Sequence, residues 1–454
     1  MPVPEQMSVL HRAWHAIPRA ALGNLVAKLA MVGLGLSITV LVARQGPRVQ
    51  GAFALFVALE SGLLTLFSGL GLWLARQVSR QQAGAAGMAL PMLRSVLRAA
   101  VGLGLLASLA LLAVSWSTKT MPFAQLWLLA LAAPFLLLVP TATGLWLGQG
   151  RMWPLNLAQV AAPASVLSGL SIVWWLLADT TRQTPMVVLV LTAWVMGKSL
   201  VAVGTAIYAL HDGRLRDDAR EDAGIQPLSP RPHWWQEWRF VAVIGAANVV
   251  SLLNYRSSLF LVEHFHGLAE VGTYSVAVTV AELLWLLSSS VTVSVYSQIG
   301  NPDRTIASKM TVQAVRINVL STLVAAPVLL AGAWWGLPWV MGSAYQASLL
   351  PLAALLPGVA AYAAATSLSA FYTNHLGKPH LSGAIAGLSL VISFGLGCLL
   401  VPQWGALGAA VSSSLGYLLA IGAAYGVFLR HAGLRWRAFW SQPSQAATIE
   451  GLKS

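Results

Sequence analysis

The chain has 454 residues, of which 57% are hydrophobic and only 9% are charged. Soluble domains carry about 25% charged residues, so this composition excludes an ordinary soluble enzyme and places most of the chain in a bilayer. The single cysteine, Cys398, excludes an intramolecular disulfide and a cysteine-based metal site.

Residues 1–22 are predicted to lie at the membrane surface. Basic, imidazole, aromatic and aliphatic side chains favour an interfacial amphipathic helix there, namely His11, Arg12, Trp14, His15, Ile17 and Arg19. The spacing of His11 and His15 also suits a metal ion, but the interfacial role is the favoured interpretation. The segment lacks the basic and apolar regions of a cleaved signal peptide. We therefore expect the first apolar stretch to remain in the membrane.

Twelve apolar stretches follow, each near the roughly 20 residues that a spanning helix needs. Turn-forming Gly and Pro residues separate several of them. The predicted spans are residues 23–43, 51–74, 95–115, 123–147, 154–178, 185–210, 239–262, 271–298, 316–341, 347–372, 381–401 and 405–429. The predicted fold class is an all-α polytopic membrane protein with about 12 transmembrane helices.

Lysine and arginine are distributed unevenly between the two ends of these spans. If the N-terminus is cytoplasmic, twenty basic residues fall on the cytoplasmic side and four on the other, Arg44, Arg48, Lys119 and Arg182. This bias predicts that both termini are cytoplasmic. Because the basic residues are dispersed in short loops, we interpret the net charge of +13 as a topology signal and expect no nucleic-acid partner.

A polar, Pro-rich stretch, residues 211–238, separates two sets of six spans. We predict a cytoplasmic linker there. The remaining boundaries are an N-lobe over 23–210, a C-lobe over 239–430 and a cytoplasmic tail over 431–454.

The two lobes resemble each other in sequence. Gly51 begins span two and Gly272, 221 residues later, begins span eight, and a glutamate follows each, Glu60 or Glu282. With six spans per lobe, corresponding helices run in the same direction. This pattern predicts a parallel repeat about an axis along the membrane normal, and such repeats bind substrate between their halves.

Charged side chains lie inside several predicted spans, where each costs roughly 2.5–3.5 kcal/mol unless it faces a partner or a cavity. They and two neighbouring amides are the candidate site residues: Lys28, Lys198 and Arg256 as cations, Glu60 and Glu282 as carboxylates, and Asn24 and Asn254 as amides. No catalytic constellation stands out. The cluster of Glu263, His264 and His266 favours a polar helix end over a metal site.

Two interpretations of these charges stay open at this point. Arg256 can pair with Glu282, and Lys28 with Glu60, simply to lock helices together. Alternatively, Arg256 and Lys28 face a substrate cavity, where the planar arginine fork suits a diphosphate. Both arrangements can also alternate within one transport cycle.

Several motifs, taken in order, resemble the signatures of bacterial polysaccharide flippases of the Wzx type. They are residues 42–47 with 51–54, residues 69–72 with Arg76, residues 254–256 with 270–277, residues 376–379, and residues 401–410. Each motif alone is weak, but their order and spacing are fairly specific and cover residues 23 to about 430.

The resemblance implies the fold of the multidrug/oligosaccharidyl-lipid/polysaccharide exporter superfamily, with two six-helix lobes forming a V-shaped central cavity. It implies a flippase, not an enzyme, that moves a polyprenyl-diphosphate-linked oligosaccharide across the bacterial inner membrane by alternating access. Membrane lipids and polysaccharide polymerase or export machinery are the further expected partners. Glu60 and Glu282 are the candidates for coupling to H⁺ or Na⁺, and no other cofactor is expected.

The chain departs from the family pattern at two positions. Members often carry an aspartate where this chain has Ser258, and another where it has Gly69. Any ion-coupling role of those two carboxylates is therefore in doubt for this chain.

Three other functions are weighed against the flippase. A cation-coupled multidrug exporter on the same fold would favour an acidic or aromatic cavity, and the excess of buried cations argues against it. A membrane-embedded glycan polymerase or acyltransferase would need a large periplasmic loop or an acid/base pair, and every predicted periplasmic loop is short. A purely structural scaffold is the fourth alternative.

Overall fold

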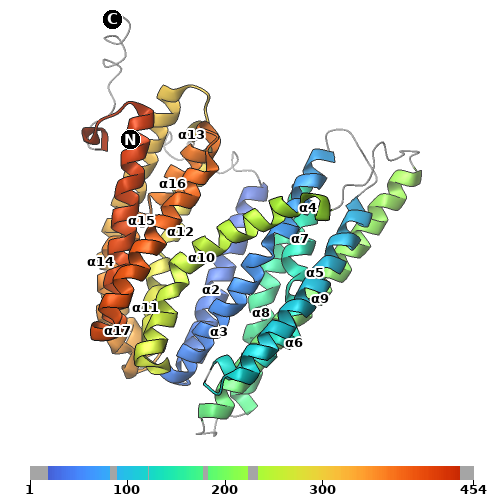
Figure 1. Cartoon of the computed structure of the whole chain (residues 1–454), viewed down its shortest axis with the longest axis horizontal. Coiled ribbons are helices and arrows are strands. Elements are labelled where there is room, and N and C mark those ends of the chain that lie inside the picture. The colour runs from blue at the N-terminus through green and yellow to red at the C-terminus, as the bar shows by residue number, and fades with distance from the viewer. Residues whose placement is uncertain (1–18, 82–88, 121, 177–182, 223–233, 440–454) are drawn as a thin grey trace, which may run out of the picture. The chain divides into compact units, whose positions relative to one another are not determined.

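The computed structural model of the chain describes residues 19–81, 89–120, 122–176, 183–222 and 234–439. Within these ranges the protein is helical and has no β-strand (Figure 1). The helices are α2 (Arg19–Ala43), α3 (Pro47–Leu66), α4 (Ser68–Gln81), α5 (Ala89–Ser117), α6 (Leu126–Leu136), α7 (Leu138–Gly148), α8 (Met152–Leu176), α9 (Gln183–Asp222), α10 (Trp238–His266), α11 (Leu268–Glu282), α12 (Trp285–Ser294), α13 (Tyr296–Ile299), α14 (Arg304–Val340), α15 (Leu349–Tyr362), α16 (Ala365–Ala370) and α17 (Pro379–Ala432).

Eleven helical segments of the described chain are long and apolar enough to cross a membrane. Each of the twelve predicted spans lies largely within one of them. The numbers differ by one because α17, with 54 residues, contains both of the last two spans and is broken at Gly405. The prediction of a multi-pass, all-α membrane protein with about twelve spans is therefore confirmed.

The break in α17 depends on Gly405, whose φ of 52° and ψ of −128° are open essentially to glycine alone. A Cβ at this position would also collide with the carboxylate of Glu270. That carboxylate accepts a hydrogen bond from the Ala406 N–H at 2.6 Å, so it caps the second half of α17. His266 Nδ1 lies 3.2 Å from Glu270 Oε2, and His266 Nε2 lies 2.8 Å from the Val401 carbonyl oxygen.

Substitution of this glycine is expected to destabilise the protein. We predict that Gly405→Ala lowers the free energy of unfolding by at least about 2 kcal/mol, because a side chain in such backbone geometry costs about 1–3 kcal/mol before any clash. Gly395→Ala is the matched control in the same helix, since a Cβ there meets no atom within 4 Å. Thermal unfolding of the detergent-solubilised variants measures the difference. Equal stability of the two variants would contradict the prediction.

The chain folds as two compact units. Unit 1 comprises residues 1–42 and 56–248, and unit 2 comprises residues 43–55 and 249–454. This division differs from the predicted lobes in two places, because the start of α3 packs in unit 2 and the start of α10 packs in unit 1.

In unit 1 the start of α10 is held against α3 and α4. A Cβ on Gly69 would meet the Val241 backbone, and a Cβ on Gly245 would meet the Leu66 carbonyl oxygen. The Asn248 amide donates to Ser68 Oγ at 3.0 Å. These close approaches explain why residues 239–248, predicted to belong to the second lobe, belong to unit 1.

The core of unit 1 is formed by α4, α5, α7 and α9. Trp73 on α4 and Trp146 on α7 are both 1% exposed and pack in one apolar cluster with Leu93 of α5. The helices α4 and α7 can approach closely because Gly71 and Gly144 face each other, and a Cβ on either would collide with backbone. The core of unit 1 thus combines buried tryptophan rings with a close helix–helix approach at two glycines.

In unit 2, α15 is the central helix and packs against α11, α14 and α17. Gly358 of α15 lies against Ser414 of α17, and its N–H donates to Ser414 Oγ at 2.8 Å. The span that contains α15 and the span that contains α6 and α7 are the two most buried of the eleven. The fourth span of each predicted lobe is therefore the most enclosed one.

The start of α3 joins unit 2 through a symmetric crossing with α11. A Cβ on Gly51 would collide with the Leu268 carbonyl oxygen, and a Cβ on Gly272 would collide with that of Pro47. Pro47 and Leu268 stand at the same distance before their respective glycines, so each helix makes the same contact with the other. Such a self-complementary contact is what a local two-fold axis produces, and the predicted repeat requires one.

Spans two, eight and ten are interrupted between two helices, a feature that hydropathy did not predict. After Phe67, after Ala361 and after Ala281 the backbone forms 3₁₀-type bonds, with N···O distances of 3.2, 3.1 and 3.2 Å. Tightened steps of this kind inside a helix often mark functional hinges. The step in span eight directly follows Glu282.

Helix α9 continues to Asp222 and so contains the first residues of the stretch predicted to be a linker. Three predictions lie wholly or mostly outside the described residues: the interfacial helix within 1–18, the linker segment 223–233 and the end of the tail at 440–454.

Candidate functional site

The strongest charge pair inside a span of unit 2 joins Arg256 of α10 to Glu282 of α11. Arg256 Nη1 lies 3.1 Å from Glu282 Oε1, and Nη2 lies 3.2 Å from Oε2. This is the two-pronged arginine–carboxylate geometry, which is stronger and more directional than a single contact. Both side chains keep about a quarter to a third of their surface exposed, at 31% and 26%. Neither side chain is fully enclosed.

Aromatic rings surround this ion pair. Tyr362 and Tyr417 have ring centroids 4.6 Å apart, and Trp285 lies 5.8 Å from Tyr362 and 6.2 Å from Tyr417. Tyr255, next to Arg256, lies 5.2 Å from Trp285. The rings come from α10, α12, α15 and α17, so only the packing of four helices brings them together. They form a firm apolar wall beside the charges.

The space enclosed beside the ion pair is small. The cavity lined by Glu282, Tyr255, Trp285 and Tyr417 has a volume of about 10 Å³. That is about the space that one water molecule needs. In this conformation the pocket is closed, and a substrate group can enter only if side chains move.

The contacts of Asn254, a predicted substrate-binding residue, do not favour that role. It is 3% exposed, and its Nδ2 donates to the Tyr362 hydroxyl at 3.3 Å. Its Oδ1 has no hydrogen-bond partner among the described groups. Asn254 therefore supports the aromatic wall, while Arg256 carries the charge.

The second charge pair lies in unit 1 and joins Glu60 of α3 to Lys198 of α9 at 2.8 Å. Glu60 is fully buried, and its other oxygen accepts a 2.6 Å hydrogen bond from Trp194 Nε1. Lys198 Nζ also lies 4.1 Å from the centre of the Trp194 ring. One tryptophan thus contacts both members of the pair, through its N–H and through its face.

The partner of Glu60 differs from the one that the sequence suggested. Lys28 was considered as its partner, but Lys198 occupies that position, since α9 packs close to α8 at Gly197 and turns Lys198 toward Glu60. The Lys28 side chain is exposed on α2, and Asn24, one turn earlier, is half-buried. Lys28 forms no ion pair with a described residue.

The two departures from the flippase pattern have different surroundings. Gly69 cannot carry a side chain without displacing the Val241 backbone, so an aspartate has no room there. Ser258, two residues after Arg256, accepts a hydrogen bond from the Tyr274 hydroxyl at 3.0 Å. A polar side chain is therefore kept at that position, without the charge.

The residues that sequence reasoning missed are the aromatic ones. Trp194, Trp285, Tyr362 and Tyr417 each contact a candidate charge or its immediate surroundings. One sequence signal could have indicated Trp194, because it lies one helical turn before Lys198. Within the described residues, no three His, Cys, Asp or Glu side chains gather to hold a metal ion.

Comparisons with known proteins give the fold. No protein-family model and no curated protein sequence matches the chain. Among solved structures, it is similar to the inward-facing conformation of a multidrug resistance MATE family transporter of the MOP superfamily, with a TM-score of 0.71, 16% identity, and coverage of 91% of this chain and 96% of that one. It is equally similar to the lipid II flippase MurJ in an inward closed conformation, with a TM-score of 0.71, 15% identity, and coverage of 92% and 89%.

A third similar structure is a MOP superfamily transporter from Pyrococcus furiosus, described as having a binding pocket of reverse polarity. Its TM-score is 0.57 and its identity 15%, with 93% of this chain and 96% of that one covered. Identities this low establish the architecture, whereas the V-shaped cavity and the relation to polysaccharide flippases stay predictions. The chain therefore has the helical fold that MATE transporters and MurJ share.

Proposed function

We propose that this protein is a flippase that moves a polyprenyl-diphosphate-linked oligosaccharide across the bacterial inner membrane by alternating access. The observation that carries the proposal is the two-pronged pair of Arg256 and Glu282 inside a span, partly exposed and walled by aromatic rings. An arginine fork that binds a carboxylate in this way also matches the oxygens of a phosphate. The MurJ structure of the same fold, a lipid II flippase by its description, supports a lipid-linked substrate.

The closed pocket suggests how binding and release are coupled. While Glu282 is ionised it occupies both terminal nitrogens of Arg256. A diphosphate oxygen that reaches the pocket competes with Glu282 for the guanidinium. When the substrate leaves, Glu282 closes the pair again. The candidate coupling ions are H⁺ and Na⁺, and the tightened backbone after Glu282 is the hinge that moves in this mechanism.

Lys28 is the second cation of the proposed mechanism. It is exposed on α2 and unpaired among the described residues, so it needs no proton transfer before it can bind an anion. A lysine acts as a mobile point charge. We assign the first capture of the diphosphate to Lys28 and its firm binding to Arg256. The polymerase or export machinery then receives the glycan on the far side of the membrane.

The proposal predicts a loss of surface polysaccharide when the gene is deleted. The oligosaccharide would remain on its lipid carrier at the cytoplasmic face, because so large a polar group does not cross hydrocarbon unaided. Immunoblotting or staining of surface glycan in the deletion strain, with and without the plasmid-borne wild type, measures this. Normal glycan in a deletion strain that has no second flippase would contradict the proposal.

A cation-coupled multidrug exporter is the second candidate function. The cluster of Tyr255, Trp285, Tyr362 and Tyr417 beside Glu282 favours it, because aromatic faces and a carboxylate bind organic cations. Arg256 disfavours it, because the arginine already neutralises that carboxylate. Greater sensitivity of the deletion strain to ethidium or benzalkonium, with normal surface glycan, would support the exporter instead.

A further inference from the structure

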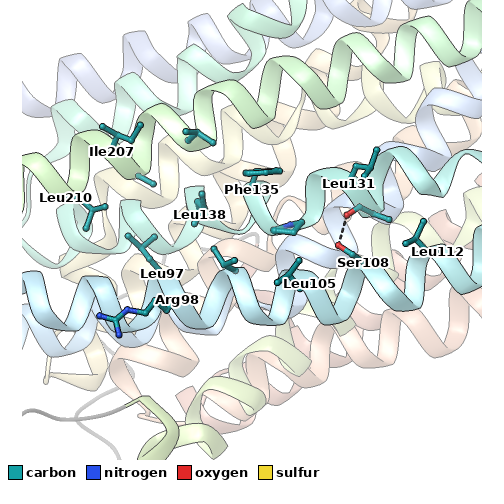
Figure 2. Close-up of a pocket in the computed structure, with 15 residues that line it drawn as sticks. Leu97, Arg98, Leu105, Ser108, Leu112, Leu131, Phe135, Leu138, Ile207 and Leu210 are labelled. Atoms are coloured by element: carbon teal, nitrogen blue, oxygen red, sulfur yellow. Dashed lines mark hydrogen bonds between the residues drawn. The ribbon is translucent and has the colours of Figure 1, made fainter.

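A hollow of about 780 Å³ lies in unit 1 between α5, α6 and α9. Figure 2 shows residues that line it, and the three helices run side by side (Figure 1). Leucines, other aliphatic residues and one phenylalanine form nearly all of its lining. Representative members are Leu97, Leu105 and Leu112 on α5, Leu131 and Phe135 on α6, and Ile207 on α9. We call this hollow the α5–α9 groove. Its volume lies within the range of pockets that bind small ligands.

The groove has no free polar group along its apolar part. Pro134 lacks an N–H, so the Ala130 carbonyl one turn earlier in α6 loses its helical partner. Ser108 of α5 donates to that carbonyl oxygen at 2.5 Å (Figure 2). A surface in contact with hydrocarbon must satisfy its backbone internally in this way. The apolar part of the groove therefore suits a hydrocarbon chain and presents no free hydrogen-bonding group to water.

The groove is also long and open at its side. From Leu97 to Leu112 it follows α5 for about 22 Å at about 1.5 Å per residue, compared with about 15 Å for one leaflet of the hydrocarbon core. Leu105, Leu131 and Ile207 are 55%, 62% and 62% exposed. All three lie in helices that are long and apolar enough to cross a membrane, and in such a helix an exposed apolar side chain is suited to contact with lipid chains. A chain that lies in the groove is covered on more sides than one on a flat helix face.

One end of the groove carries a positive charge. Arg98 lies there, beside Leu97 and Leu210, and Leu112 marks the opposite end (Figure 2). No carboxylate is among the described residues that line the groove, so none of them neutralises the guanidinium. The distribution of basic residues predicts that this end is cytoplasmic. Basic pockets between helices on that side bind the head groups of anionic lipids.

We propose that the α5–α9 groove binds one acyl chain of an anionic phospholipid whose phosphate contacts Arg98. The lipid is a resident one and not the transported cargo, because the groove contains none of the candidate site residues. A chain lying across α5, α6 and α9 joins three helices of unit 1 and stabilises their packing. This inference does not depend on which substrate the protein transports.

The test uses the full-length protein in nanodiscs that contain a phosphatidylglycerol with a photoreactive acyl chain. After irradiation, labelled peptides are quantified by mass spectrometry. We expect labelling of α5, α6 and α9 at least fivefold above that obtained with the matching phosphatidylcholine probe. Leu105→Trp, which fills the groove, should reduce labelling at least fivefold. Leu106→Trp is the matched control, because Leu106 is its neighbour, is 64% exposed and does not line the groove.

The head-group contact is tested in the same way. Arg98→Gln should remove the preference for phosphatidylglycerol, whereas Arg94→Gln, one turn away and outside the lining, should keep it. If Leu105→Trp does not yield folded protein, Leu131→Trp fills the groove from α6. Equal labelling of Leu105→Trp and Leu106→Trp, or of the two probes, overturns the proposal. So does stronger competition by polyprenyl phosphate than by unlabelled phosphatidylglycerol, since the groove would then hold the cargo.

Discussion

Replacing Arg256 by alanine is expected to reduce glycan export at least tenfold while the protein still reaches the membrane. The variant loses a two-pronged contact to phosphate oxygens, and truncating one partner of a hydrogen-bonded charge pair costs about 2–5 kcal/mol. Arg256→Lys should recover only part of the activity, because a lysine keeps the charge and loses the planar fork. Surface glycan at equal membrane expression, measured in the deletion strain, gives the comparison.

The double variant Arg256→Met with Glu282→Leu separates substrate binding from helix locking. If the pair only locks α10 to α11, removing both charges leaves no unpaired group and should restore export, as replacement of an ion pair by apolar residues often preserves folding. If Arg256 binds the diphosphate, the double variant should stay inactive although it folds. Restored export would therefore contradict the proposed role of Arg256.

Glu282→Gln addresses the coupling in the same site. A glutamine keeps the shape of Glu282 but cannot hold Arg256 by charge. Substrate binding should persist in this variant, while transport should lose its dependence on an H⁺ or Na⁺ gradient.

Replacing Glu60 by alanine is expected to lower the free energy of unfolding by about 3 kcal/mol. Glu60 is 0% exposed and accepts bonds from both Lys198 and Trp194. Removing one partner of a buried pair costs about 3–5 kcal/mol, because the other charge stays behind unpaired. We place the loss at the lower end because the Lys198 side chain is 22% exposed and can reach water. Denaturant or thermal unfolding in detergent measures it.

The control for Glu60 is the double variant Glu60→Leu with Lys198→Leu. It removes both charges from the interior of unit 1 and should be nearly as stable as the wild type. Glu60→Gln should fall between the two, because the amide oxygen still accepts a bond from Trp194 Nε1. A double variant as unstable as Glu60→Ala would show that the pair is not what stabilises α3 against α9.

The sequence by itself determined the class of the protein, the number of its spans and the internal repeat. These follow from local composition: a spanning helix must be about 20 apolar residues long, and the break between the last two spans needs a residue such as Gly405. The pairing of Arg256 with Glu282 could also be predicted from the sequence, because consecutive helices with a short connection pack as neighbours. For the same reason the match of Gly51 to Gly272 could be found from spacing.

Only the tertiary structure decided which charges meet and what surrounds them. Glu60 pairs with Lys198 and not with Lys28, since the rotation of α9 about its axis depends on its glycine contact with α8. The rings around Arg256 come from four helices far apart in the chain. Hydropathy carries no information about such neighbours, because apolar residues occur on every face of these helices. The α5–α9 groove is hidden from the sequence for the same physical reason: a hollow is set by how helices pack, and composition alone does not encode it.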